Sequence, residues 1–238
     1  PTLCTNIALT EEKDFAIMLL RGNNGSLLFG YNLESDKIEW EEPINDQFAS
    51  SPVIINNTVF LTSNRVKKEQ VGQPTLYAYD ILTGRRVLIK EFSRNNENQA
   101  VILKVLERYS NISDNNSTIL LSINKLDPAG DYREVALIET TSNSVLWQSK
   151  IDVGWGHTPD FMLVKEDNTE LLLLILRHDI IALNTKDGKE KWREKFSSSR
   201  LVVWNKKILR LNVAEKYMAL WDPVSQEKIW DYSDVRKP

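Results

Sequence analysis

A ten-residue segment recurs five times without gaps along the 238-residue chain, and this repetition limits the possible folds more than any other feature. The copies occupy residues 31–40, 79–88, 138–147, 183–192 and 221–230. Each copy starts where an apolar run ends, and its second residue is acidic or an amide: Asn32, Asp80, Glu139, Asn184 and Asp222. Short polar side chains of this kind bond nearby backbone N–H groups and start turns.

Two further positions are shared by the copies. Four residues after the polar residue stand Asp36, Gly84, Asn143, Gly188 and Gln226. Four of these five are types that tolerate the positive φ of a tight hairpin. Eight residues after the polar residue stand Trp40, Leu88, Trp147, Trp192 and Trp230. A large apolar side chain at a fixed place after a hairpin turn is expected to dock into the seam beside its own sheet, as a wedge.

The copies lie 48, 59, 45 and 38 residues apart, which brackets the length of a four-stranded propeller blade. Short apolar runs precede each hairpin, and no long segment has a helical period, although residues 101–106 could also begin a helix. We therefore predict an all-β fold, a β-propeller of five four-stranded antiparallel blades in one domain over residues 1–238. The predicted blades are residues 1–43, 44–92, 93–152, 153–196 and 197–238.

The predicted units run in phase from Thr5 to Tyr232, with no strand borrowed between the termini to close the ring. Three outcomes stay open on this ground. The chain is a five-bladed ring, part of a larger seven- or eight-bladed ring, or a set of blades that a partner completes.

The repeats resemble those of the quinoprotein-type (PQQ-like) β-propellers, most closely at residues 181–192 and next at residues 76–84. WD40 repeats are the alternative, because residues 218–222 and the pair Gly156-His157 are similar to their motifs. Enzymes of the quinoprotein family bind a quinone and calcium and usually carry adjacent cysteines, whereas Cys4 is the sole cysteine here. The resemblance therefore implies the non-enzymatic branch, whose members act as assembly or recognition platforms.

The sequence carries no recognisable catalytic or metal-binding motif. His157 and His178 are its two histidines, and no HxH, HExxH, CxxC or Gly-x-Ser-x-Gly pattern accompanies them. We predict no catalytic, metal or cofactor residues and no cofactor. An enzyme that binds a small polar ligand in the central channel is the alternative. The first strands argue against it, because they carry the apolar residues Ile54, Ile102, Leu163 and Val202.

Charge and hydropathy exclude two classes of partner. The chain has 30 basic and 33 acidic residues without a dense basic run, so nucleic acid is not an expected partner. The longest apolar runs, residues 15–20 and 171–176, are far shorter than the roughly 20 residues that span a bilayer. No signal peptide is visible at the N-terminus.

Long insertions are expected on one rim of the propeller, at residues 65–75, 94–99 and 126–134. Insertions gathered on one face of a repeat protein often mark its binding face. We therefore predict a non-enzymatic protein-interaction or assembly scaffold whose rim contacts a protein partner. The predicted contact residues are Lys67, Lys68, Asp127, Asp131, Tyr132 and Arg133, with Trp155 and His157 nearby. Mobile solvated loops without a partner are the alternative.

Five sequons bear on the compartment. Their candidate glycan acceptors are Asn24, Asn56, Asn111, Asn115 and Asn116. About two or three such matches are expected by chance in a chain of this composition. With the family resemblance, they favour an extracytoplasmic protein (secretory lumen, cell surface or periplasm), and the cytoplasm is the alternative.

Overall fold

The computed structural model describes most of the chain. The described ranges are 3–4, 7–10, 14–23, 25–44, 49–63, 66–67, 70–71, 74–93, 100–106, 118–126, 132–152, 160–166, 169–176, 179–196 and 200–233. No residue in these ranges is helical, so none of them belongs to a helix long and apolar enough to cross a membrane. The described chain is all-β, as predicted.

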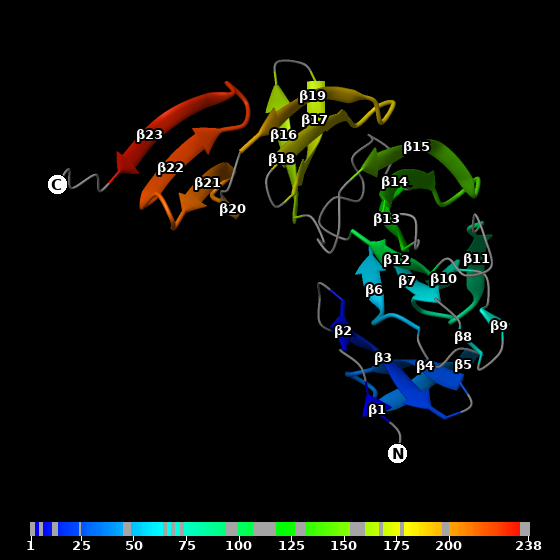
Figure 1. Cartoon of the computed structure of the whole chain (residues 1–238). Coiled ribbons are helices and arrows are strands. Elements are labelled where there is room, and N and C mark those ends of the chain that lie inside the picture. Colours follow the sequence, from blue (N-terminus) through cyan, green and yellow to red (C-terminus); the bar gives the residue numbers. More distant parts are fainter. Residues whose placement is uncertain are drawn as a thin grey trace. The chain divides into compact units, whose positions relative to one another are not determined.

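The chain forms two compact units, Pro1–Asp152 and Val153–Pro238 (Figure 1). The first unit holds three antiparallel sheets of four or five strands and one small two-stranded sheet. The first sheet contains β1 (Leu3–Cys4), β2 (Ala8–Leu9), β3 (Phe15–Gly22), β4 (Gly25–Asn32) and β5 (Lys37–Ile44). The second contains β6 (Val53–Ile55), β7 (Thr58–Ser63), β10 (Thr75–Asp80) and β11 (Arg86–Glu91). The third contains β12 (Ala100–Val105), β13 (Thr118–Leu126), β14 (Tyr132–Glu139) and β15 (Ser144–Asp152).

The second unit holds two more four-stranded sheets. The fourth sheet contains β16 (Asp160–Glu166), β17 (Thr169–Ile175), β18 (Asp179–Asn184) and β19 (Glu190–Lys195). The fifth contains β20 (Arg200–Trp204), β21 (Lys207–Asn212), β22 (Tyr217–Asp222) and β23 (Glu227–Ser233). In all five sheets the strands pair in chain order, although β1 and β2 share the place of one first strand beside β3.

Two details complete the strand assignment. Residues 101–106, for which a helix was also considered, lie mostly in β12, which pairs along its whole length with β13. The insertion predicted at residues 65–75 contains a small hairpin of β8 (Val66–Lys67) and β9 (Gln70–Val71).

The repeated motif forms the last hairpin of every sheet. The polar residue accepts backbone N–H groups of its turn in several copies; Asn32 Oδ1, for example, accepts from Glu34 and Ser35 at 2.9 and 3.0 Å. The fourth residue after it has positive φ in all five copies: Asp36 (55°), Gly84 (66°), Asn143 (54°), Gly188 (68°) and Gln226 (57°). Each hairpin also contains a register shift just before the polar residue. This shared geometry confirms the hairpin predicted from the repeat.

The register places each wedge residue opposite a fixed partner on the neighbouring strand. The pairs are Trp40 with Gly30, Leu88 with Ala78, Trp147 with Leu137, Trp192 with Ala182, and Trp230 with Leu220. Directly opposed residues of antiparallel strands point to the same face. We call the face that carries the wedge residue the leading face of a sheet, and the opposite face its trailing face.

Leading and trailing faces of successive sheets form the cores within each unit. Trp40 and Ile17 of the first leading face share a core with Val59 and Tyr79 of the second sheet. Phe60 and Leu88 of the second leading face share another core with β12, β13 and β14. In the second unit, Leu173 of the fourth leading face shares a core with Ile208 and Trp221 of the fifth sheet. Each of these seams is therefore a layer of apolar side chains between two sheets.

In the seam between the first and second sheets, two glycines leave room for the indole ring of Trp40. Its indole Nε1 donates a 2.8 Å hydrogen bond to the carbonyl of Ile81, just after the polar residue of the next hairpin. A Cβ on Gly30 would lie 2.4 Å from this indole, and a Cβ on Gly84 would lie 2.5 Å from it. The ring is thus held between two glycines, one in its own sheet and one in the next, as predicted for a wedge in the seam.

Candidate interaction surfaces

The rim predicted from the insertions is described only in part. Lys68, Asp127, Asp131, Trp155 and His157 lie outside the described residues. Lys67 lies in β8 and Tyr132 in β14, but only their backbone is described. Arg133 is 3% exposed, so its side chain offers almost no surface to a partner. The partner contact at this rim stays a prediction.

A buried polar cluster lies next to this rim, on the trailing face of the third sheet. Lys125 Nζ is 3.1 Å from Glu134 Oε2, and the two side chains are 7% and 11% exposed. Gln148 Nε2 donates a 2.7 Å hydrogen bond to the same carboxylate oxygen. A buried ion pair with an added hydrogen bond is satisfied internally, so this cluster fixes the local packing and is not available to bind a partner.

We number each seam after the sheet whose leading face it covers. The fourth seam, between the fourth and fifth sheets, differs from the first seam, between the first and second sheets, at both positions that flank the wedge residue. Ala182 stands where the first sheet has Gly30, and Gln226 stands where the second hairpin has Gly84. Trp192 is only half-buried, and it packs edge-on against Trp221 at 5.9 Å between ring centroids. Its Nε1 is buried and has no hydrogen-bond partner among the described residues, unlike that of Trp40. Trp192 is thus held less closely than Trp40.

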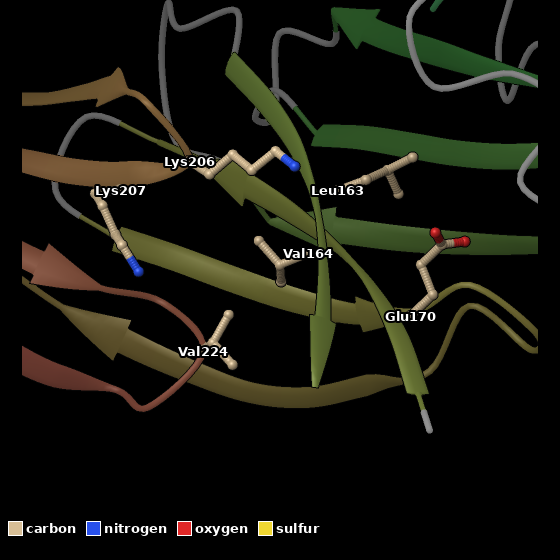
Figure 2. A pocket seen from close by; sticks show the side chains of 6 residues that line it. All are labelled: Leu163, Val164, Glu170, Lys206, Lys207 and Val224. Atoms are coloured by element: carbon tan, nitrogen blue, oxygen red, sulfur yellow. The ribbon is translucent and has the colours of Figure 1, made fainter. Parts of the chain in front are cut away.

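A pocket of about 530 Å³ lies in the second unit, between the fourth and fifth sheets. It is lined by Leu163, Val164, Glu170, Lys206, Lys207 and Val224 (Figure 2). Val164 belongs to the core that also contains Trp221, and Val224 packs against that core. The pocket therefore opens where the turn before β21 and the turn after β22 meet the first two strands of the fourth sheet.

The two lysines of the pocket have different surroundings. Lys207 Nζ lies 2.5 Å from Asp222 Oδ2. Partial burial opposes ionisation of Asp222, but the hydrogen bonds from Lys207 and from the Val224 N–H outweigh it and hold the pKa of this carboxyl below its usual range. Lys206 is exposed, and no ion pair or hydrogen bond joins its ammonium to another described residue. One positive charge of the pocket is thus neutralised, and the other is open.

The leading face of the fifth sheet carries exposed aromatic side chains. The register puts three columns of paired residues on this face: Val202, Leu209, Leu220 and Trp230; on one side of them Arg200, Leu211, Met218 and Tyr232; and on the other side Trp204 and Lys207. Trp230 is 40% exposed and Tyr232 57%, whereas Trp40, Leu88 and Trp147 are at most 9% exposed. The prediction of a wedge holds for these three buried residues. At Trp230 the indole is instead exposed, and within the second unit no described sheet packs against this face.

The residues considered for a central channel are partly described. Ile54 and Val202 are half-buried, Leu163 lines the pocket and Ile102 is 44% exposed. His178 lies outside the described residues, as His157 does. Within the described ranges, no group of three or more His, Cys, Asp or Glu side chains could hold a metal ion.

One of the predicted glycan acceptors is described. Asn56 is exposed, in the two-residue turn between β6 and β7, with a φ of 53°. Asn24, Asn111, Asn115 and Asn116 lie outside the described residues. An exposed turn is accessible to a glycosyltransferase, so the structure is compatible with a glycan at Asn56.

Sequence reasoning identified Trp230 as a wedge but not as an exposed surface residue, and it missed the pocket. The five copies of the motif look alike whether or not a sheet covers them. One signal for the pocket was present, because residues 205–206 form a tight turn without glycine, with φ of 47° at Asn205 and 58° at Lys206.

By sequence, the chain matches no protein-family model and no curated protein. Many solved structures are similar to it, and three of them share 8% sequence identity and a TM-score of 0.54 with the chain. The WD40 domain of SCAP from fission yeast matches 97% of this chain and 55% of its own. A complex of the fission yeast SREBP–SCAP binding domains matches 96% of this chain and 60% of its own. A chain from a study of two prolyl endopeptidases matches 94% of this chain and 33% of its own.

These likenesses show the fold and nothing finer. This chain corresponds to less than two thirds of each solved chain, at an identity far too low to carry activities or partners across. Together with the five antiparallel sheets of four or five strands, they establish that the chain has a β-propeller fold.

Proposed function

We propose that the protein is a non-enzymatic interaction scaffold and that a partner protein docks on the leading face of the fifth sheet. The observation that carries this proposal is the exposure of Trp230 and Tyr232 on a sheet face that also carries Val202, Leu209 and Leu211. Exposed apolar surface rich in aromatic residues is typical of protein-binding sites. The solved complex of SREBP and SCAP binding domains is a similar propeller with a protein partner, which agrees with this role.

The covered seams indicate what the partner must offer. The leading faces of the first, second and fourth sheets each pack against an apolar sheet face. At the first seam the covering sheet also supplies the Ile81 carbonyl to the indole of Trp40. The partner of the fifth face therefore presents an apolar surface with a backbone carbonyl within reach of Trp230.

Two finer assignments belong to the same proposal. We assign the repeats to the quinoprotein (PQQ-like) type, supported by the Trp40 geometry and by the turn with positive φ in every copy. We also place the protein outside the cytoplasm, supported by the exposed sequon at Asn56. Both are compatible with a scaffold and neither is required by it.

The docking site is tested by site-specific photo-crosslinking in cells that express the protein. Tyr232→p-benzoylphenylalanine places the crosslinker on the proposed face, and crosslinked proteins are identified by mass spectrometry. We expect a crosslinked partner that is lost when Trp230→Arg is added. Val213→Arg is the matched control, because Val213 is 88% exposed in the same sheet but lies in the turn after β21, outside the proposed face. Absence of any crosslink, a crosslink unaffected by Trp230→Arg, or crosslinks only between copies of the chain would overturn the proposal.

A further inference from the structure

We infer that the pocket between the fourth and fifth sheets binds a short peptide segment that carries an acidic residue next to an aliphatic one. Of the described residues of the fifth sheet that line the pocket, Lys206 and Val224 are in turns and Lys207 is the first residue of β21, and neither Trp230 nor Tyr232 is among them. The inference extends the proposed function by a second site with a ligand of defined chemistry.

The apolar part of the pocket fits an aliphatic side chain. Leu163, Val164 and Val224 supply its apolar lining, and Val164 is only 6% exposed. At about 530 Å³ the pocket falls in the size range of small-ligand sites, which is large enough for two or three side chains. Its apolar lining therefore favours burial of Leu, Ile or Val from a partner.

The open charge of the pocket fits a carboxylate. Asp222 already neutralises Lys207 at 2.5 Å, whereas Lys206 has no partner among the described residues. In Figure 2, Val164 lies between the lysines and Glu170. An acidic residue of the ligand is therefore attracted to the Lys206 side and repelled from the Glu170 side. This asymmetry sets the direction in which a peptide lies across the apolar lining.

The backbone of Lys206 supports a role for its side chain. Its φ is 58°, in the left-handed region where glycine is preferred and where a lysine costs stability. Asn-Gly is the favoured pair for this kind of two-residue turn. Lysine at this position therefore disfavours the turn and supplies a cation to the pocket, a combination that is typical of functional sites.

This strain makes Lys206→Gly an unusually clean test. The substitution removes the charge and relieves the backbone, so any loss of binding cannot come from unfolding. Lys216→Gly is the matched control, because Lys216 is also exposed with positive φ (49°) but lies in the turn before β22, at the opposite end of the fifth sheet. Both variants should keep or raise the urea midpoint of the wild-type chain.

The experiment selects ligands from a phage-displayed library of random hexapeptides and measures the selected peptides by fluorescence anisotropy. We expect enrichment of Asp or Glu beside Leu, Ile or Val, affinity that weakens as salt rises, and affinity about 10-fold weaker for Lys206→Gly, because a charge-assisted contact is lost. Lys216→Gly should bind as the wild type does. Glu170→Gln should admit acidic residues at the other end of the peptide.

Two results would overturn the inference: selection without acidic residues, or equal affinity for Lys206→Gly and Lys216→Gly. Either result would leave the Trp230 crosslinking outcome untouched, since that experiment probes a different face of the fifth sheet. Failure of the crosslinking with successful peptide selection would, conversely, remove the proposed docking face and keep the pocket.

Discussion

Gly84→Ala tests whether the wedge geometry stabilises the propeller. Gly84 has a φ of 66°, and a Cβ added there would lie 2.5–2.7 Å from three carbon atoms of the Trp40 indole. The indole cannot move aside freely, because its Nε1 is bonded to the Ile81 carbonyl and Gly30 lies against its other part. The substitution therefore introduces two separate penalties, one in the backbone and one in packing.

The two penalties can be estimated separately. A non-glycine residue in the left-handed region costs about 1–2 kcal/mol. Overpacking a close contact of this kind costs about 1–3 kcal/mol. The sum, about 2–5 kcal/mol, is a large fraction of the 5–15 kcal/mol by which a domain of this kind is typically stable. We therefore expect a strongly lowered free energy of unfolding for Gly84→Ala.

The assay is urea unfolding followed by tryptophan fluorescence and circular dichroism, combined in a double-mutant cycle with Trp40→Leu. In the Trp40→Leu background the ring is absent, so Gly84→Ala should cost only the backbone part, and the two substitutions should be coupled by about 1–3 kcal/mol. Gly84→Asn is the control, because asparagine accepts positive φ but keeps the clashing Cβ. A loss below about 0.5 kcal/mol for Gly84→Ala, or additive effects in the cycle, would refute the sandwich of Trp40 between two glycines.

Three further predictions concern other parts of the chain. Lys125→Met should lower the free energy of unfolding by about 3–5 kcal/mol, because it leaves Glu134 buried without its cation. The double variant Lys125→Met with Glu134→Met should lower the free energy of unfolding by less, and equal losses for the two variants in urea titrations would contradict this. Asp222, whose folded pKa is lowered, stabilises the fold fully above its unfolded pKa of about 3.9, and this contribution is lost as the pH falls through the folded pKa; Asp222→Asn should therefore lower the urea midpoint at pH 7 and have a progressively smaller effect as the pH is lowered below about 3.9. When the chain is directed into a secretory pathway, peptide mass spectrometry should find a glycan at Asn56 that Thr58→Val removes, and an unmodified wild-type Asn56 would contradict the prediction.

The sheets were predictable because each repeat contains the residues that determine its own hairpin. The polar residue, the positive-φ residue and the wedge stand at fixed offsets, and all five copies form the same turn with the same register shift. Local turn chemistry fixes this much without knowledge of neighbours. The strand at residues 100–105 was ambiguous because a short apolar run fits a helix as well as a strand, and its pairing with β13 decides between them.

The surfaces were less predictable because exposure depends on residues far away in the sequence. Trp230 and Trp40 occupy equivalent positions, yet Trp230 is 40% exposed and Trp40 only 9%. Arg133 was expected at a contact surface by its place in a long insertion, and it is buried. Insertion length tells where a loop emerges, whereas the packing of neighbouring strands determines which side chains remain accessible.

The first and fourth seams show how the same repeat gives different packing at its wedge residue. Glycines at positions 30 and 84 admit the indole of Trp40 fully, so the seam closes and a buried N–H finds its acceptor. Where Ala182 and Gln226 replace those glycines, Trp192 stays half-buried with an unpaired N–H, and Val224 beside the same core lines an open pocket. Glycine is not needed at every wedge, because Leu88 opposite Ala78 and Trp147 opposite Leu137 are also buried, so the fourth seam differs from the first by the combination of a large indole with Ala182 and Gln226.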